Sequence, residues 1–266
     1  MQLAIDKKRI ADSFSRAAAT YDSVAGLQRD VALALLDSVQ PYLSAEPRCV
    51  IDLGCGTGFV SGQLHQRIDA QQHIAIDLAH GMLQQARTQL PSDIQLCGGD
   101  AEALPLCSGA VDQLYTSLAI QWCESPQRVF AEMSRVLAPG GIAAVATLGP
   151  NTLHELKQAW AQVDNYQHVN HFVDLDTLTA QLPSGLTPLL VKQENRTLRY
   201  AQLRELTTEL KQLGAHNMNA GEAKGLTGPQ RVKQFRAAYE ALRADDGKLP
   251  ATYQVYYLIL RKEHHG

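Results

Sequence analysis

The chain has 266 residues, of which 45% are hydrophobic and 19% charged, and its formal net charge is -3. This length and apolar content predict one large α/β core with an added cap, because two independent domains would each be small. The weak negative charge excludes a global attraction to nucleic acid or to an anionic membrane, so an acidic partner would have to meet a local basic patch.

The five cysteines are odd in number and show no Cys-x-x-Cys spacing. This argues against a disulfide framework or a structural zinc site and favours a reducing, cytoplasmic setting. Residues 1–16 lack the apolar core of a signal peptide, and no stretch approaches transmembrane length. His168 and His171 have no third ligand in view in the sequence, so no metal site is expected.

The first half of the chain alternates short apolar runs with segments of helical periodicity. Between Ile5 and Gln40 the periodicity predicts two helices, broken near residues 21–23. The pattern that follows predicts strands at 49–53, 73–77, 94–97, 110–116 and 142–147, and helices at 59–68, 79–90 and 126–137, with Pro139-Gly140-Gly141 as a break before the fifth strand. Strands that alternate with helices predict a parallel sheet.

The second half combines further helices with two strands. Residues 152–163, 174–182, 201–213 and 229–243 are predicted helices, 186–193 a sixth strand and 251–260 the last strand. The predicted helices at 201–213 and 229–243 are additional to those of a minimal α/β sheet. We therefore expect residues 196–250 to form a helical cap inserted before the last strand, within a single domain covering 1–266.

The first predicted strand ends in Asp52-Leu53-Gly54-Cys55-Gly56-Thr57-Gly58. Glycine has no Cβ and tolerates positive φ, so this backbone can pass close to a ligand. A dinucleotide fold needs Gly-x-Gly-x-x-Gly, whereas here the third glycine comes one place early and Phe59 stands where a small residue is required. The spacing disfavours a nicotinamide oxidoreductase, which stays as an alternative.

Two more anchors follow in order along the chain. Asp77 ends the second strand, where its carboxylate can accept both hydroxyls of a ribose. Asp100 and the Ala101 backbone follow the third strand and can meet an adenine ring. Each residue alone is equally a turn or cap residue, but three anchors in order favour an adenosyl cofactor. Cys55 has no neighbouring Lys or His to activate a thiol and is interpreted as a small loop residue.

Residues 50–58, Asp77 and 99–105 resemble the motifs of class I S-adenosylmethionine-dependent methyltransferases. The resemblance implies a Rossmann-like, seven-stranded, mostly parallel sheet with an antiparallel last strand, and S-adenosyl-L-methionine as the cofactor. It assigns the methionine end to Asp52 and the 54–56 backbone, the ribose to Asp77, and the adenine to Asp100 and Ala101. The implied cofactor-binding residues are Gln28, Asp52, Gly54, Cys55, Gly56, Asp77, Leu78, Asp100, Ala101 and Ser117.

Separate segments also resemble the malonyl-acyl-carrier-protein O-methyltransferases of biotin synthesis. They are residues 10–21 with Gln28, 117–123, 203–219 and 249–256, of which LKxxGA in the third and SxxxQWC in the second are the more discriminating. Asn217-Met218-Asn219 departs from the pattern of this family, at a place where the family varies, and this leaves the role of that loop open. The resemblance implies methyl transfer to a malonyl carboxylate carried by an acyl-carrier protein or coenzyme A, with no nucleic-acid or membrane partner.

A malonyl carboxylate is already ionised at neutral pH, so the implied reaction needs no general base. The enzyme must instead align the reacting atoms, exclude water and orient the carboxylate. The resemblance places residues 1–40 over the cofactor and Tyr21 near the methyl group as the catalytic residue. An ordinary helix-end aromatic is the alternative for Tyr21.

Five residues are candidates for binding the acceptor substrate. Gln121 and Trp122 follow the fourth strand, at the edge where α/β sheets bind ligands, although Trp122 can equally pack in a core. Arg199, Arg204 and Lys211 are candidates for holding a carboxylate or meeting an acidic carrier protein, and a solvated surface is the alternative for each. Further positive charges of the proposed cap are Arg196, Lys224, Arg231, Lys233 and Arg236.

Other functions stay open from the sequence alone. A small carboxylic acid or a ring carbon of a quinone precursor is an alternative acceptor. A non-catalytic regulator that binds an adenosyl ligand is an alternative of a different class.

Overall fold

A computed structural model describes residues 6–43, 46–215 and 228–264 of the chain. Within these residues the strands are β1 (Cys49–Leu53), β2 (Gln72–Asp77), β3 (Gln95–Gly98), β4 (Val111–Ser117), β5 (Leu137–Leu148), β6 (Leu186–Tyr200) and β7 (Leu249–Lys262). The α-helices are α1 (Lys7–Val24), α2 (Gly26–Val39), α3 (Phe59–Arg67), α4 (His80–Gln89), α5 (Pro126–Val136), α6 (His154–Ala161), α7 (Leu175–Ala180), α8 (Leu203–Gln212) and α9 (Pro229–Glu240). Two 3-10 turns are η1 (Gln40–Tyr42) and η2 (Ile120–Trp122).

The strands form one seven-stranded sheet in the order β3-β2-β1-β4-β5-β7-β6. Neighbours from β3 to β5 pair in parallel, and β7 is antiparallel to both β5 and β6. The expected Rossmann-like sheet with an antiparallel last strand is therefore confirmed. The chain leaves β1 toward β2 on one side and returns to β4 on the other, which makes the carboxyl ends of β1 and β4 the switch point where such sheets bind ligands.

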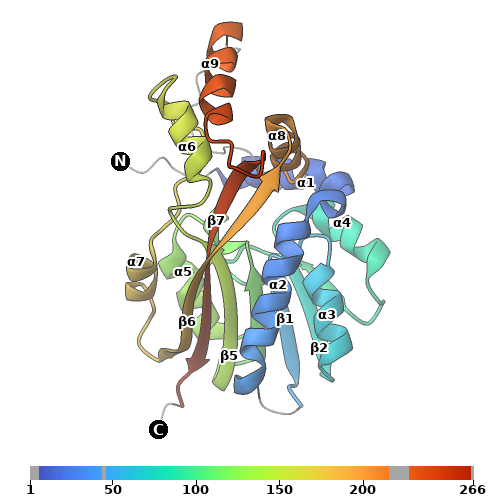
Figure 1. Ribbon diagram of the computed structural model, residues 1–266. Coiled ribbons are helices and arrows are strands. Elements are labelled where there is room, and N and C mark those ends of the chain that lie inside the picture. Colours follow the sequence, from blue (N-terminus) through green and yellow to red (C-terminus); the bar gives the residue numbers. More distant parts are fainter. Residues whose placement is uncertain (1–5, 44–45, 216–227, 265–266) are drawn as a thin grey trace.

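Helices cover both faces of the sheet (Figure 1). Alternate residues of the strands belong to two separate buried clusters, so that Val50 lies in one cluster and Ile51 in the other. The first cluster includes residues of α2, α6, α8 and α9, and the second includes residues of α5 and α7. Because successive side chains of a strand point to opposite faces, this alternation places the two sets of helices on opposite sides of the sheet.

Two strands differ from the sequence-based prediction. The sixth strand, expected at 186–193, continues to Tyr200 and pairs with β7 along its length, so residues 196–200 belong to the sheet and the added helices begin after them. Residues 192–200 of this edge strand are mostly polar, a pattern that resembles a loop more than a buried strand. Pro139-Gly140-Gly141 was expected to break the chain, but it lies within β5, beside a register irregularity between Val111 and Gln113 of β4.

The first break in the helices also lies later than predicted. Helix α1 continues through residues 21–23 to Val24, and Ala25 separates it from α2. None of the helices in the described part of the chain is both long and apolar enough to span a membrane.

The helices α8 and α9 lie at one end of the sheet, beside α1 and α6 (Figure 1). At the start of α8, Gln202 and Glu205 cap each other's backbone N–H groups, which sets where this helix begins. At its end, the buried hydroxyl of Ser13 in α1 donates to the carbonyl of Gly214 at 3.2 Å. The amino-terminal helix and the segment before the last strand therefore pack together. Asn217-Met218-Asn219 and Lys224 lie outside the described residues.

Candidate active site

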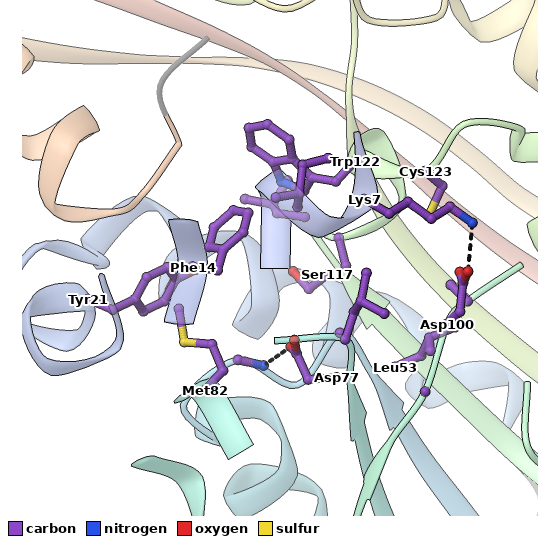
Figure 2. Close-up of a pocket in the computed structure, with 18 residues that line it drawn as sticks. Lys7, Phe14, Tyr21, Leu53, Asp77, Met82, Asp100, Ser117, Trp122 and Cys123 are labelled. Atoms are coloured by element: carbon purple, nitrogen blue, oxygen red, sulfur yellow. Dashed lines mark hydrogen bonds and ion pairs between the residues drawn. The ribbon is translucent and has the colours of Figure 1, made fainter. Parts of the chain in front are cut away.

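A cavity, here called the first cavity, opens at the carboxyl ends of β1, β2, β3 and β4 and encloses about 790 Å³ of empty space, including open solvent (Figure 2). Helix α1 and the loops after these four strands form most of its walls. Its lining residues are Lys7, Ile10, Phe14, Tyr21, Leu53, Gly54, Gly56, Asp77, Leu78, Met82, Gly99, Asp100, Ala101, Ser117, Leu118, Ala119, Trp122 and Cys123. Residues from all three predicted anchors therefore meet in one cavity.

The glycine loop after β1 depends on the absence of side chains. Gly54, Gly56 and Gly58 have φ values of +74°, +55° and +96°, which L-residues rarely adopt. A Cβ on Gly54 would lie 2.3 Å from the Cβ of Ala119, in the loop after β4. A Cβ on Gly56 would meet no atom within 4 Å, so this backbone borders open space. The loop thus presents bare backbone to the first cavity.

Asp77 joins the end of β2 to this loop. Its carboxylate accepts hydrogen bonds from the backbone N–H of Gly56 at 2.8 Å and from that of Ala79 at 2.7 Å. Burial raises the pKa of Asp77, while these backbone donors oppose the rise. The side chain is therefore held in a fixed orientation at the cavity wall, where a carboxylate can also accept hydroxyl donors from a ligand.

The wall after β3 carries a cluster of charges. Lys7 of α1 donates to the Asp100 carboxylate at 2.6 Å and also forms an ion pair with Glu102. Asp100 in turn accepts from the backbone N–H of Glu102 at 2.9 Å. These contacts hold Asp100 against the amino-terminal helix. Asp100 and Ala101, the residues predicted to meet an adenine, both line this side of the first cavity.

Helix α1 closes the first cavity with one face. Lys7, Ile10, Phe14 and Tyr21 all line the cavity and are spaced so that they share a side of the helix. The helix approaches α4 closely: the backbone N–H of Gly81 donates to the Ser15 hydroxyl at 3.1 Å, and a Cβ on Gly81 would overlap the Ser15 backbone. Figure 2 shows the Phe14 and Tyr21 side chains at the cavity, and both pack against the buried cluster of Ala18, Ala79 and Met82.

Two smaller cavities adjoin the first and are called the second and the third. The third cavity lies where the glycine loop meets α1 and α2. It is lined by Tyr21, Asp22, Ala25, Gln28, Arg29, Ala32, Gly54, Cys55, Gly56, Thr57, Phe59, Val60 and Ser117. Three buried polar atoms around it, Gln28 Oε1, Arg29 Nε and Ser117 Oγ, have no hydrogen-bond partner among the described residues. Buried polar groups are rarely left unpaired, so this cluster fits a polar ligand group.

Asp52 lies beneath the loop and not in the cavity wall. It is only 2% exposed, and its carboxylate accepts a hydrogen bond from the Ser61 hydroxyl at 2.6 Å. Burial raises its pKa to about 7. The side chain lines neither the first nor the third cavity, so its contact in this structure is with the start of α3.

The thiols near the site are not activated nucleophiles. Burial raises the pKa of the Cys55 thiol, with the carboxylates of Asp77 and Asp52 adding to the effect. Burial likewise raises the pKa of Cys123 to about 12. A reactive cysteine needs the opposite shift. The part of the chain that the structure describes also contains no group of three His, Cys, Asp or Glu side chains placed to hold a metal ion.

A second cavity adjoins the first and shares Phe14, Tyr21, Leu118 and Trp122 with it. It encloses about 630 Å³ of empty space, including open solvent. Its other lining residues are Leu27, Gln28, Gln121, Leu148, Thr152, Leu153, Val169, Asn170, Phe172, Leu210, Leu213, Ala215 and Tyr253. Gln121 and Trp122, predicted to bind the acceptor, both border it, and the Trp122 ring packs edge-on against Phe14 at 5.3 Å between centroids.

The predicted cationic substrate residues lie elsewhere. Arg199 is in β6 and forms an ion pair with Asp246 at 3.3 Å. Arg204 and Lys211 are exposed on α8. None of the three lines the first, second or third cavity, so the structure does not bring them together with the other candidate site residues.

Comparisons with known proteins agree with this geometry. Residues 51–145 match a family described as a methyltransferase domain. A malonyl-[acyl-carrier protein] O-methyltransferase of Gallionella capsiferriformans is 39% identical over 265 residues, which cover 96% of this chain and 91% of that protein. The chain belongs to the malonyl-[acyl-carrier protein] O-methyltransferase family.

A longer relative and a solved structure complete the comparison. The biotin biosynthesis bifunctional protein BioHC of Cellvibrio japonicus is 51% identical over 260 residues, but this chain spans only 51% of that protein's length. Among solved structures, the YcgJ protein of Bacillus subtilis has a TM-score of 0.60 at 15% identity, covering 87% of this chain and 99% of that one. At this low identity, the similarity shows that the two proteins share a fold.

The four segments that resembled the O-methyltransferase family each border these cavities. Residues 10–21 supply the cavity-facing side of α1, and 117–123 lie between the first and second cavities. The described part of the third segment contributes Leu210 and Leu213, and 249–256 contributes Tyr253. The segments are far apart in the chain but lie together at these cavities in the fold. This explains why the resemblance is distributed along the sequence.

Several lining residues are not predicted from the sequence. Lys7 stands in a charged amino-terminal stretch with no motif around it. Phe14 and Tyr253 lie inside two of the resembling segments, which was a signal that could have found them. Ala119 faces Gly54 only because β1 and β4 are neighbours in the sheet, a pairing that no local pattern reveals.

Proposed function

We propose that this chain is an S-adenosylmethionine-dependent O-methyltransferase that converts the free carboxylate of a malonyl thioester, carried by acyl-carrier protein, into its methyl ester. The observation that carries the proposal is the shared wall of Phe14, Tyr21, Leu118 and Trp122, where a cavity bordered by the glycine loop meets a cavity of mostly apolar lining. Relatives at 39% and 51% identity are named for this reaction or for biotin synthesis, which supports the proposed acceptor.

The residues present fit the cofactor. S-adenosylmethionine supplies a methyl group on a positively charged sulfur, which a carboxylate can attack without deprotonation. In this proposal Asp77 accepts the ribose hydroxyls, and Asp100 with Ala101 meets the adenine. The unpartnered atoms of Gln28, Arg29 and Ser117 fit the charged amino and carboxylate groups of the methionine end. Leu78, which is 42% exposed, adds apolar contact at the cavity wall.

The protein's own contribution is position and exclusion of water. Helix α1 covers the first cavity, and the rings of Phe14, Tyr21 and Trp122 stand where the two cavities meet. Holding two reactants in line at such a junction can lower a barrier by about 7–11 kcal/mol. Burial keeps the Tyr21 hydroxyl protonated by raising its pKa, so Tyr21 acts as a hydrogen-bond donor that orients the acceptor.

The proposal is tested by incubating the purified chain with S-adenosylmethionine and each of four acceptors: malonyl-acyl-carrier protein, malonyl-coenzyme A, free malonate and a small monocarboxylic acid. Mass spectrometry follows the gain of one methyl group, and formation of S-adenosylhomocysteine is measured separately. We expect methyl transfer to the malonyl thioesters. Transfer to the monocarboxylic acid with none to either thioester would contradict the proposed acceptor while keeping the reaction class.

A further inference from the structure

The second cavity holds no positive charge on its described lining residues. This is unexpected for a site that receives a carboxylate, because Arg and Lys are the usual partners of carboxylates. The polar side chains that line it are neutral. Of these, Gln121 already donates to the carbonyl of Leu118 and accepts from Thr147, and Thr152 donates to the carbonyl of Gln254.

Apart from Gln28, which is assigned above to the methionine end of the cofactor, three neutral donors remain available among the described residues of this cavity. The hydroxyls of Tyr21 and Tyr253 and the indole N–H of Trp122 have no hydrogen-bond partner among the described residues. Tyr21 and Trp122 line both the first and the second cavity, whereas Tyr253 lines only the second. Tyr253 therefore faces a part of the acceptor that lies farther from the methyl group.

Tyr253 is fixed in place by the sheet. It stands in β7, paired with Arg196 of β6, and is only 5% exposed. Burial raises the pKa of its hydroxyl, and the nearby carboxylates of Glu209 and Glu155 raise it further. The group stays a phenol and can only donate to an acceptor oxygen or accept from a donor. The same two carboxylates disfavour any second negative charge at this end of the cavity.

We propose that Tyr253 is an acceptor-binding residue and that the second cavity receives the malonyl group through the neutral donors Tyr21, Trp122 and Tyr253, with no cation among its described lining residues. This inference rests on the proposed function and names how its acceptor is recognised. Tyr21 and Trp122 meet the carboxylate, and Tyr253 donates to the thioester carbonyl oxygen. The site thereby selects one carboxylate on an otherwise uncharged acyl arm.

The reaction explains why a neutral site is suited to this task. A carboxylate oxygen forms a bond to the methyl carbon, the carbon–sulfur bond breaks, and its electron pair stays on sulfur. One negative and one positive charge are consumed and no proton moves. A cation against the carboxylate would stabilise the reactant more than the transition state and would slow the step. Neutral donors orient the carboxylate at a smaller cost in nucleophilicity.

The first test compares two tyrosine variants. We expect Tyr253→Phe to raise KM for malonyl-coenzyme A by about tenfold, the loss of one hydrogen bond in a buried site, with S-adenosylmethionine affinity and Tm close to wild type. Tyr239→Phe is the matched control, because its hydroxyl donates to the Pro250 carbonyl at 2.8 Å. It should lower Tm and leave KM unchanged. An unchanged KM in Tyr253→Phe would overturn the role of Tyr253.

The second test introduces a positive charge, which the described lining residues of the second cavity do not supply. Asn170 lines the second cavity and is partly exposed, so Asn170→Lys and Asn170→Met place side chains of similar length there that differ in charge. The acceptors are monoethyl malonate, with one carboxylate, and free malonate, with two. We expect wild type and Asn170→Met to favour the half-ester by about 100-fold or more, since a second buried charge has no partner. Asn170→Lys should narrow that preference at least tenfold.

The outcomes separate this inference from the proposed function. A wild-type enzyme that methylates no malonyl thioester would contradict the proposed function itself. An enzyme that methylates malonyl-coenzyme A but shows the same half-ester preference in Asn170→Lys and Asn170→Met would retain the function and overturn the neutral acceptor cavity.

Discussion

The carboxylate of Asp77 lies 2.8 Å from the backbone nitrogen of Gly56 and accepts its hydrogen bond. This contact ties the end of β2 to the glycine loop after β1, so two of the three predicted cofactor anchors are joined directly. Each carboxylate oxygen can accept a second hydrogen bond. Asp77 can therefore hold the loop and bind ribose hydroxyls at the same time.

We expect Asp77→Ala to weaken S-adenosylmethionine binding by about 1–3 kcal/mol for each hydroxyl left without its acceptor. The loop also loses the acceptor for the Gly56 N–H. Isothermal titration calorimetry measures the affinity. Asp93→Ala serves as a control, because Asp93 has the same charge but sits at the surface, paired with His65. Equal affinity in Asp77→Ala and wild type would remove Asp77 from the cofactor site.

Gly54→Ala should destabilise the protein for two separable reasons. The new Cβ would lie 2.3 Å from that of Ala119, and the residue would have to keep a φ of +74°. Overpacking of this kind costs about 1–3 kcal/mol, measured as the free energy of unfolding in urea. The double variant with Ala119→Gly should recover the steric part and leave the backbone part.

Gly26→Ala is the control for the glycine substitution, since a Cβ at Gly26 meets no atom within 4 Å and the residue stands in the first turn of α2. It should leave stability unchanged or raise it by up to about 1 kcal/mol. If Ala119→Gly gave no recovery in the Gly54→Ala background, the contact between the two loops would not be what requires glycine.

Tyr21→Phe should lower kcat with little change in Tm. The Tyr21 ring packs beside Ala18 and Met82, and this packing survives the loss of a hydroxyl that has no partner among the described residues. Tyr115→Phe should behave in the opposite way, because its hydroxyl donates to Gln113 at 2.8 Å within the core. Normal turnover in Tyr21→Phe would assign Tyr21 a packing role.

Asp52 gives the protein a defined dependence of stability on pH. Its pKa is about 7 in the folded protein and about 4 in an unfolded chain. The folded state therefore binds the proton more tightly, and the contribution of this group to the free energy of unfolding falls as pH rises from about 4 to about 7. Above this range it is constant.

Asp52→Asn removes this titration and keeps an oxygen that can accept from Ser61. The stability of the variant relative to wild type should therefore grow by up to about 1.4 kcal/mol per pH unit between pH of about 4 and 7. Urea unfolding at several pH values measures it. A difference that stays constant over the range would show that Asp52 does not titrate there.

Much of the fold was predictable because its signals are local. The strand β1 is a short apolar run that ends in a glycine loop, and the same alternation of strand and helix continues to β5. The edge strand β6 was only half predicted, since residues such as Glu194 and Arg196 face solvent and each other and carry no hydrophobic pattern. The pairing with β7 that holds them extended is a long-range contact.

The candidate site is predictable where the backbone conformation requires a particular residue type. It is less predictable where residues far apart in the sequence contact one another through their side chains. Gly54, Gly56 and Asp77 could be found from spacing alone. The charge cluster of Lys7 with Asp100 requires knowing that α1 returns over the sheet. The charge of Arg204 makes it a candidate for binding a carboxylate, but the direction in which a helix face points depends on packing, and α8 turns its leucines inward.

Helix α8 separates two kinds of side chain that matter for the partner. Leu210 of α8 and Leu213, the residue just after the helix, line the second cavity, while Arg204 and Lys211 are exposed to solvent. We propose that these two charges form a dock for a negatively charged carrier protein. A charge at such a dock acts mainly on the association rate and is screened over about 8–10 Å at moderate salt. Both the chain and an acidic carrier protein are net negative, so a local positive patch must bring them together.

Replacing Arg204 and Lys211 together by Glu should therefore lower kcat/KM for malonyl-acyl-carrier protein far more than for malonyl-coenzyme A, and raising the ionic strength of the wild-type assay should do the same. The control replaces Arg48 and Arg261 by Glu, which makes the same change in net charge. These two residues lie at the amino ends of the parallel strands, because Arg48 precedes β1 and Arg261 pairs with Ile142 near the start of the parallel part of β5. This control should affect both thioesters alike. If the α8 variant also affected both alike, its charges would be ordinary solvated surface, and the carrier protein would have to dock elsewhere.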